Sequence, residues 1–440
     1  MSDTAASDPD SASAASASDP ASASAASASD PASASAASDP ASASAASNPA
    51  SASAAASAAA AAAFVKASAI VAKAKDFVTN NNGYMIGIVI AIALVAGIII
   101  FIIYSKVNQK QNEIKSTYVI TNNTIKSLNT IKTADADIVT MPLRNFYIKT
   151  ALNCCCLGEW KNDYVDVIAL QSAIAQGYRC LDFEIYSQDN KPVVAASTKN
   201  SFYYKETYNS IPFSDAMYAV AQNAFNPTKT PNGTDPLFIY LRIKSNNPKI
   251  IPDIVAAINA QFGGQLLGPD YNYAYNGNNL GQSPISHFVG KVIIITDLSN
   301  PLCTDKDLPL FQLINFGSNS PFLHQLQYEM GVKNTPDMDA LIDHNKKNMS
   351  IVFPDPPFQE NINFNIASAF GCQFIGMMPQ LKDDNLAIYN AAFDNAGSSF
   401  ILKPPELCYQ PVVIETPPPQ NPALSLAGRN YSTDYASWSV

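Results

Sequence analysis

The 440-residue sequence has few charged residues and few histidines, and both shortages narrow the functions that it can support. Charged residues make up 14% of the chain, which is low for a soluble protein. The net charge is -9 and no basic face stands out, so a nucleic acid is not expected as a partner. The three histidines are His287, His324 and His344. No residue before His287 can therefore supply an imidazole for catalysis or metal binding.

Cysteine pairs of the kind that bind zinc or undergo redox chemistry are also missing. The seven cysteines include no CxxC pair, and three of them are adjacent at residues 154–156. No histidine stands at zinc-finger spacing, so a zinc site is not expected. We interpret the cysteines as small buried apolar residues of a protein in a reducing compartment.

The first sixty residues lack the side chains that a folded core needs. Residues 1–50 contain no aromatic and no branched aliphatic residue, and they consist almost entirely of Ala, Ser, Asp and Pro. Such a segment cannot bury enough apolar surface to offset its ordering entropy, and the repeated Asp-Pro pairs break any helix. We therefore predict a disordered arm over residues 1–60. Residues 61–80 predict either an amphipathic helix on a membrane or a plain solvated Ala-rich helix.

One long stretch of the sequence contains no charged residue. It reads YMIGIVIAIALVAGIIIFIIY over residues 84–104, with a tyrosine at each end. A helix of this length spans about 31 Å, which matches a hydrocarbon core of roughly 30 Å. The sequence therefore predicts one membrane-spanning helix, and lysines on both sides leave its orientation open. Small residues four apart, such as Gly87 and Ala91, would allow helix-mediated self-association.

Between residues 141 and 415 the sequence alternates between two patterns. Apolar runs rich in β-branched and aromatic residues predict strands, and segments with helical spacing of apolar residues predict helices between them. This alternation predicts an α/β fold, a TIM-like β/α barrel. Residues 105–140 are polar and predict a stalk, and residues 416–440 predict a disordered tail. The strand-like runs lie at 178–186, 236–243, 291–296, 349–353, 374–378 and 400–403.

Two segments of this region carry a resemblance to a known family. SAIAQGYRCLDFEIYSQDNKPVV combines a helix, a turn, an acidic strand and a hairpin. GCQFIGMMPQLKDDNLAIYNAAFDNAGSSFILKPPEL, over residues 371–407, combines a Gly-Cys-Gln strand, a helix and a closing Leu-Lys-Pro. In this order and spacing, the segments resemble the barrel of phosphoinositide-specific phospholipase C. The resemblance implies the fold of the phospholipase-C-like phosphodiesterases from about residue 145 to residue 407.

The same resemblance implies an active site whose histidines are missing here. The family cleaves phosphodiesters with two histidines and one calcium ion. Its first histidine falls on Leu152 and its second on Ala196. Because no histidine precedes His287, a small shift in the comparison restores neither position. We therefore expect the barrel to be catalytically inactive.

The family's calcium ligands are kept only in part. Asn153 is retained, and Asp182 and Glu184 stand two residues apart on a strand, so they share one face. The fourth ligand position falls on Arg242, whose positive charge opposes a metal ion. We therefore expect neither calcium nor another cofactor. Arg242 is expected to bridge both carboxylates as a structural counter-ion, with a solvent-exposed arginine as the alternative.

Together these observations predict a single-pass membrane protein with a phospholipase-C-like barrel. The barrel is expected to bind a lipid headgroup or a protein partner, or to serve as a structural module, and the composition suits a virion or a cell-surface membrane. One alternative is an active phosphodiesterase that cleaves phosphatidylinositol or glycerophosphodiesters and recruits Asp355 or Glu360 as its base. A second alternative is a spacer in which the barrel only adds bulk.

Overall fold

The computed structural model describes most of the chain after the first sixty residues. The expected disordered arm over residues 1–60 lies outside the described residues. The helix expected over residues 61–80 is described in part, and residues 65–73 are helical. The described residues are 65–73, 75, 83–121, 128–199, 204–274, 279–411, 417, 419, 421 and 427–440.

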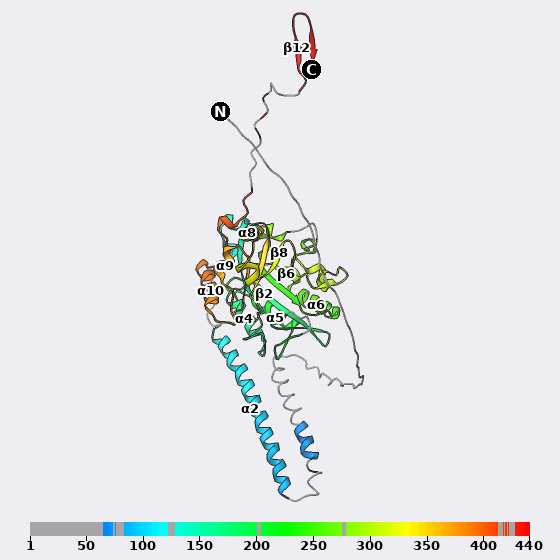
Figure 1. The fold of residues 1–440 in the computed structure, drawn as a ribbon, viewed down its shortest axis with the longest axis vertical. Helices are drawn as coiled ribbons and strands as arrows, with labels where there is room; N and C mark the ends of the chain where they lie inside the picture. Colours follow the sequence, from blue (N-terminus) through cyan, green and yellow to red (C-terminus); the bar gives the residue numbers. More distant parts are fainter. Residues whose placement is uncertain are drawn as a thin grey trace, which may run out of the picture. The chain divides into compact units, whose positions relative to one another are not determined.

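A nearly closed barrel of parallel strands forms the core of the protein (Figure 1). Its strands are β1 (Phe146–Ala151), β2 (Cys180–Gln188), β5 (Leu237–Ile243), β6 (Val292–Asp297), β7 (Phe316–Ser318), β8 (Leu323–Gln327), β9 (Met349–Phe353) and β10 (Phe374–Met377). Hydrogen-bonded neighbours run in the order β7-β6-β5-β2-β1-β10-β9-β8, so β7 and β8 flank the seam. We call the end at which these strands finish the mouth, and the opposite end the base. This architecture confirms the predicted β/α barrel.

The barrel strands form because their sequences are apolar on both faces. β5 (LFIYLRI) and β9 (MSIVF) are buried along their whole length. Such continuous apolar runs are typical of parallel strands that are covered on both sides. Inside the barrel, Phe238 of β5 meets Phe374 of β10 edge to face, with ring centroids 5.2 Å apart. The interior is therefore a packed core and not a pore.

Helices connect the strands and cover the barrel from outside (Figure 1). Several begin at side-chain caps, which supply acceptors to the first free N–H groups of the helix. Asp166 accepts from the N–H of Ile168, and Asp383 accepts from the N–H of Leu386. The helices of this layer are α3 (Ala136–Thr140), α4 (Val167–Ala175), α5 (Phe213–Ala224), α6 (Ile251–Phe262), α7 (Pro301–Thr304), α8 (Met338–Lys347), α9 (Phe364–Ala369) and α10 (Asp384–Ala396).

Three short strands lie beside the barrel path. The strand expected over residues 400–403 is β11 (Phe400–Leu402), which pairs antiparallel with β1. β3 (Lys191–Ala195) folds back antiparallel on β2, and β4 (Ile211–Pro212) pairs with β3. The turn from β2 to β3 uses Asp189 and Asn190 at φ of +52° and +59°, which are residue types that tolerate the left-handed region.

The last residues differ from the disordered tail expected over residues 416–440. β12 (Asn430–Ser432) and β13 (Ser437–Ser439) form an antiparallel hairpin. Aromatic residues alternate with serines on either side of a turn, and this pattern pairs Tyr431 with Trp438 at a centroid distance of 5.6 Å.

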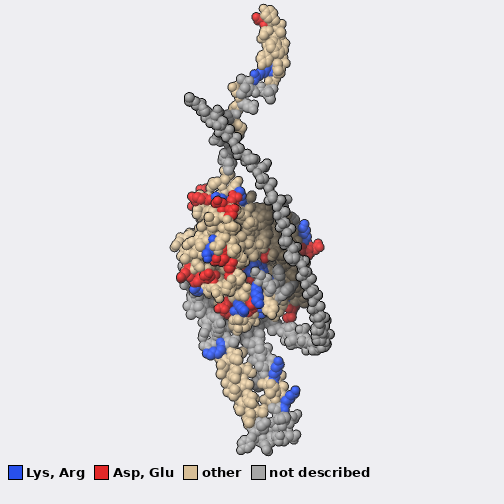
Figure 2. Space-filling model, viewed as in Figure 1, with Lys and Arg blue, Asp and Glu red and all other residues tan. Residues whose placement is uncertain are grey.

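The apolar stretch lies within one long helix, α2 (Gly83–Thr121). Its segment Gly87–Lys106 has a mean hydropathy of 3.0 and is long and apolar enough to cross a membrane. Figure 2 shows a stretch of the protein below the barrel in which the described side chains are uncharged, in keeping with this composition. In the polar stalk expected over residues 105–140, α2 continues to Thr121, and residues 128–140 contact the barrel.

A short linker, residues 128–133, joins the barrel at its base. Ile131 is buried, and its N–H donates to Asp235 Oδ1 at 2.8 Å. Asp235 comes two residues before the start of β5, so this contact lies at the base. The N–H of Asn129 donates to the carbonyl of Gly397 at 2.7 Å. The chain therefore enters the barrel at the end opposite the mouth.

Candidate functional site

Three neighbouring strands bring four polar side chains together at the mouth. Asn153 follows β1, Asp182 and Glu184 lie on β2, and Arg242 lies on β5. β2 runs between β1 and β5, and its register places Glu184 opposite Arg242. The structure therefore joins all four residues that the sequence singled out for this site. We call them the mouth cluster.

Arg242 stands at the centre of the mouth cluster. Its Nε and Nη2 donate to Oδ1 and Oδ2 of Asp182, both at 2.6 Å. Its Nη1 donates to Glu184 Oε1 at 2.7 Å, and Nη2 also donates to Asn153 Oδ1 at 3.1 Å. The planar fork of the guanidinium suits this bidentate contact. The expected bridge between the two carboxylates is confirmed, and the alternative of a solvent-exposed arginine is wrong.

Both carboxylates also accept hydrogen bonds from donors other than Arg242. Asp182 Oδ2 accepts from the N–H of Asn153 at 2.9 Å. Glu184 Oε2 accepts from the hydroxyl of Tyr186 at 2.9 Å and from the N–H of Ser197 at 3.0 Å. Because each carboxylate oxygen has at least one donor, both groups serve as acceptors within the fold. Neither presents a free oxygen to a substrate.

Burial makes the electrostatics of the mouth cluster strong. Arg242 is 7% exposed, Glu184 is 2% exposed and Asp182 is fully buried. Burial on its own lowers the pKa of Arg242, but Asp182 and Glu184 raise it, and the pKa lies well above its usual value. The guanidinium carbon also lies 5.1 Å from the ring centroid of Phe353, which adds a cation–π contact. Arg242 is therefore a permanent cation at this site.

These residues do not fit the calcium ion that the family resemblance implies. Calcium binds roughly six to eight oxygen ligands. Here a guanidinium contacts all three side chains that would supply such oxygens, namely Asn153, Asp182 and Glu184. Within the described part of the chain, no group of three His, Cys, Asp or Glu side chains could hold a metal ion.

The two positions on which the resemblance places the family's histidines lie in the packed core. Leu152 and Ala196 are both fully buried. Leu152 packs so closely on Gly376 that a methyl group added there would lie 2.6 Å from its side-chain carbons. In the loops after β1 and β9, the rings of Trp160 and Phe358 are in contact at a tilt of 35°, with centroids 4.2 Å apart. Apolar contacts thus occupy the space in which an imidazole would have to work.

All three histidines of the chain lie at the base. His324 is the second residue of β8, and His344 is in α8 with Nε2 at 3.1 Å from the carbonyl oxygen of Met349, the first residue of β9. His287 lies in the 3-10 turn Ile285–Phe288, which precedes β6. In barrels of this type, chemistry takes place at the mouth. All three histidines therefore lie at the end of the barrel opposite the mouth cluster.

The two carboxylates considered as alternative bases differ in their surroundings. Asp355 follows β9 at the mouth and is half-buried. Its Oδ2 accepts from the N–H of Glu329 at 2.7 Å, so the side chain holds the turn Glu329–Lys333. Glu360 is exposed in the loop after it. No hydrogen bond among the described residues connects either carboxylate to the mouth cluster.

No sequence pattern indicates the second polar network, which lies in the barrel interior. The hydroxyl of Tyr240 lies 2.8 Å from Ser318 Oγ, and it donates to Gln325 Oε1 at 2.8 Å. These residues come from β5, β7 and β8, which are far apart in the chain. Only the closed barrel brings them together, so no local motif could have identified them.

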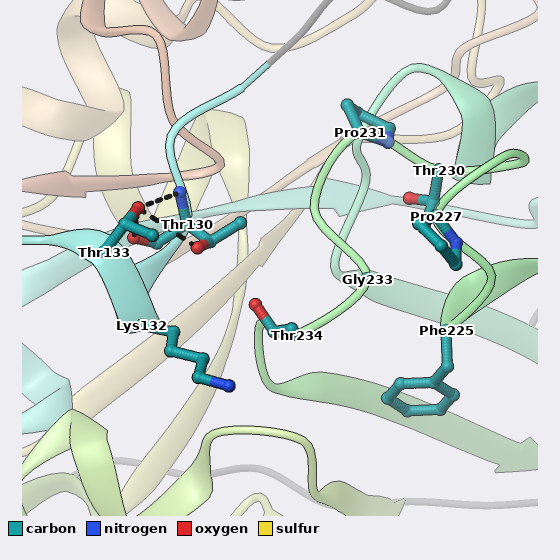
Figure 3. A pocket seen from close by; sticks show the side chains of 9 residues that line it. All are labelled: Thr130, Lys132, Thr133, Phe225, Pro227, Thr230, Pro231, Gly233 and Thr234. Carbon is teal, nitrogen blue, oxygen red and sulfur yellow. Dashed lines mark hydrogen bonds between the residues drawn. The ribbon is translucent and has the colours of Figure 1, made fainter.

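The sequence also missed a pocket beside the linker (Figure 3). Its volume is about 790 Å³. Figure 3 shows Lys132 extending from the linker toward Thr234, with the ring of Phe225 on the far side. An ammonium group and hydroxyls thus face apolar walls, which suits a small ligand with an anionic end. The lining residues are Thr130, Lys132, Thr133, Phe225, Pro227, Thr230, Pro231, Gly233 and Thr234.

Comparison with known proteins supports the fold. Residues 139–296 match the family described as phosphatidylinositol-specific phospholipase C, X domain. The matched segment contains the whole mouth cluster and both positions of the family's histidines. A search of curated proteins found no match.

The comparison with solved structures found phospholipases C at low sequence identity. The crystal structure of S. officinalis PLC21 has a TM-score of 0.50 and 16% identity, and the match covers 60% of this chain and 37% of that chain. L. pealei PLC21 has a TM-score of 0.49 and 15% identity, with 60% and 38% covered. A calcium-dependent phosphoinositol-specific phospholipase C from a Pseudomonas species has a TM-score of 0.38 and 11% identity, with 57% and 95% covered. The chain thus spans little more than a third of the two PLC21 chains.

Proposed function

Because residues 139–296 belong to the X-domain family of phosphatidylinositol-specific phospholipase C, we propose that this barrel is a member that no longer cleaves phosphodiesters. On this proposal the apolar part of α2 crosses a membrane once. The barrel works beside that membrane as a binding or structural module, and its ligand is a lipid headgroup or a protein partner.

The residues at the mouth of the barrel are the main support for this proposal. Cleavage of a phosphodiester by a neighbouring hydroxyl needs a base, an acid and a positive centre for the developing charge. Leucine and alanine at positions 152 and 196 cannot transfer a proton. The positive group that is present, Arg242, is bound on three sides by Asp182, Glu184 and Asn153. Its Nε, Nη1 and Nη2 all donate to these three side chains, so the guanidinium is held by groups of the protein and not by a phosphate.

The attachment of the linker gives further support. A hydrolase that acts on lipids of its own membrane must turn its mouth toward that membrane. In this chain the segment that leads from α2 enters at the base, where Ile131 bonds to Asp235. This connection favours a barrel whose mouth points away from the helix that anchors it.

The direct test is hydrolysis by the full-length chain in mixed micelles. We expect phosphatidylinositol and glycerophosphodiesters to remain intact with calcium at about 1 mM, a concentration that fills typical weak calcium sites. The matched comparison is the variant Asp182→Asn. Calcium-dependent release of inositol phosphate that disappears in this variant would contradict the proposal and favour the active phosphodiesterase, with Asp355 as the candidate base.

A binding assay separates the module from a spacer. We expect the full-length chain in detergent to bind a soluble inositol phosphate, because Lys132 and the threonines of the pocket can hold an anion. Lys132→Glu should reduce binding at least tenfold. Lys229→Glu is the matched control. Lys229 is exposed next to the pocket residue Thr230, but it does not line the pocket itself. Equal binding by both variants would place the ligand elsewhere, and no binding by any of them would favour a protein partner or a spacer.

A further inference from the structure

The mouth cluster contains the oxygen ligands of a cation site, but its positive charge comes from a side chain of the protein, Arg242. Two carboxylates on β2 and one amide oxygen just after the end of β1 converge at this point. Two neighbouring carboxylates in a buried position require positive charge, because an unpaired buried charge is strongly destabilising. Arg242 meets this requirement, and its guanidinium is the group on which Asp182, Glu184 and Asn153 all converge.

We propose that Arg242 is a tethered replacement for a bound metal ion, and that truncating it uncovers a latent site for a hard divalent cation such as calcium. Asn153, Asp182 and Glu184 would be the ligands of this site. Carboxylate and amide oxygens are the ligands that calcium prefers. The inference concerns charge and stability, so it does not depend on whether the barrel hydrolyses a substrate.

The contacts of Arg242 explain why an arginine serves here. Both oxygens of Asp182 and one oxygen of Glu184 each receive a separate N–H group at 2.6 to 2.7 Å. A lysine has a single ammonium centre and cannot match both carboxylates in the same plane. The guanidinium also lies over the ring of Phe353. A cation fixed to β5 also needs no metal from solution, so the folded state should be independent of calcium.

The experiment compares thermal unfolding of the full-length chain in detergent, with EDTA and with calcium. The wild-type midpoint should be the same in both. Arg242→Met should have a much lower midpoint in EDTA, and about 10 mM calcium should raise it by at least about 4 °C, as expected when a ligand binds only the folded state. The double variant Arg242→Met/Asp182→Asn should lose this response to calcium.

Arg179→Met is the matched control for the loss of a buried arginine. Arg179 is fully buried and donates to the carbonyls of Ala224 and Asn232, away from the mouth cluster. This variant should also be destabilised, but calcium should leave its midpoint unchanged. A similar calcium response in Arg179→Met would indicate a nonspecific effect and would overturn the proposal.

A second variant covers the case in which Arg242→Met does not fold. Arg242→Glu supplies a further carboxylate, so it should fold in calcium and unfold in EDTA, as followed by circular dichroism. If neither variant gains structure or stability from calcium, the latent site does not exist. A shift of the wild-type midpoint by calcium would equally overturn the proposal, because the tethered cation should exclude the metal.

Discussion

At the scale of single residues, the mouth is closely packed around Leu152. This is the position on which the resemblance places a family histidine, and its side chain needs the space left by the missing Cβ of Gly376. Ala196, the second such position, is equally buried. Both side chains therefore extend the apolar core toward the mouth. Restoring one histidine would bury a polar group without a partner.

The first prediction concerns this contact. Gly376→Ala should lower the free energy of unfolding by about 1–3 kcal/mol, because the added methyl group overlaps Leu152. In the background of Leu152→Ala the same change should have a much smaller effect. Chemical denaturation of the four proteins gives the coupling energy. Simple additivity would show that the two residues do not compete for the same space.

The second prediction concerns the stacked histidines at the base. The rings of His324 and His344 lie 3.6 Å apart at 10°. Burial lowers the pKa of both, and His324 lowers that of His344 further. The folded chain therefore binds fewer protons than the unfolded chain, and stability should fall as the pH drops below about 6.5, the ordinary pKa of histidine. Above that pH, both rings are neutral in both states and their contribution is constant.

His344→Gln tests this sign. The melting temperature of the wild type should decrease between about pH 7.5 and about pH 5.5, and the variant should lose less over the same interval, because only one ring remains to be protonated. An equal decrease in both proteins would show that other groups control the acid sensitivity. The exposed His287 provides the control through His287→Gln, which should behave as the wild type.

At the scale of elements, the linker and the barrel base depend on one buried carboxylate. Asp235 is fully buried, and burial raises its pKa to about 6. One of its oxygens accepts from the N–H of Ile131, while the other has no hydrogen-bond partner within the described residues. This arrangement makes Asp235 an anchor for the segment that follows α2.

The third prediction removes this anchor. Asp235→Ala should cost about 1–3 kcal/mol, because it leaves the buried N–H of Ile131 without an acceptor. Asp235→Asn retains an acceptor oxygen and should be close to the wild type. Hydrogen exchange followed by mass spectrometry should show loss of protection in the linker for the alanine variant alone. Unchanged protection would mean that the linker is held by its other contacts.

The elements that the sequence predicted well are those with strong local signals. The strand expected over residues 349–353 is β9 without any shift, because five consecutive buried residues leave a continuous apolar run. β7 and β8 were missed, since FGS is very short and LHQLQ mixes polar with apolar residues. Their strand form depends on pairing with β6 and β9, which a local pattern cannot show.

The residues of the candidate site also divide into those that the sequence indicates and those that only the folded chain brings together. Asp182, Glu184 and Arg242 were all found through the resemblance to the family, and the alternation of side chains along a strand placed the two carboxylates on one face. The Trp160–Phe358 and Tyr240–Ser318 contacts join segments distant in sequence. The pocket beside the linker was missed for another reason. Its walls come from a region that the sequence presented only as a polar stalk and a loop.

At the scale of the whole molecule, one apolar helix decides whether the chain is a membrane protein. The fourth prediction places charge in its middle. Ile92→Arg with Val95→Arg should release the chain from carbonate-washed membranes, because each arginine at the centre of a span costs about 2.5–3.5 kcal/mol on insertion. Asn112→Arg with Ser116→Arg, beyond the apolar segment of α2, should leave it in the membrane. Retention of the first variant would show that α2 does not cross the bilayer.

The burial of the cysteines provides a way to determine on which side of the membrane the barrel lies. Six of the seven thiols are buried, and Cys408 is partly accessible. Burial raises the pKa of the Cys408 thiol, so a maleimide should react with it faster at mildly alkaline pH. An impermeant maleimide added to sealed vesicles would label this one position only if the barrel faces outward. Because the fold buries the other six thiols, labelling of Cys408 alone would report the side of the membrane on which the barrel lies.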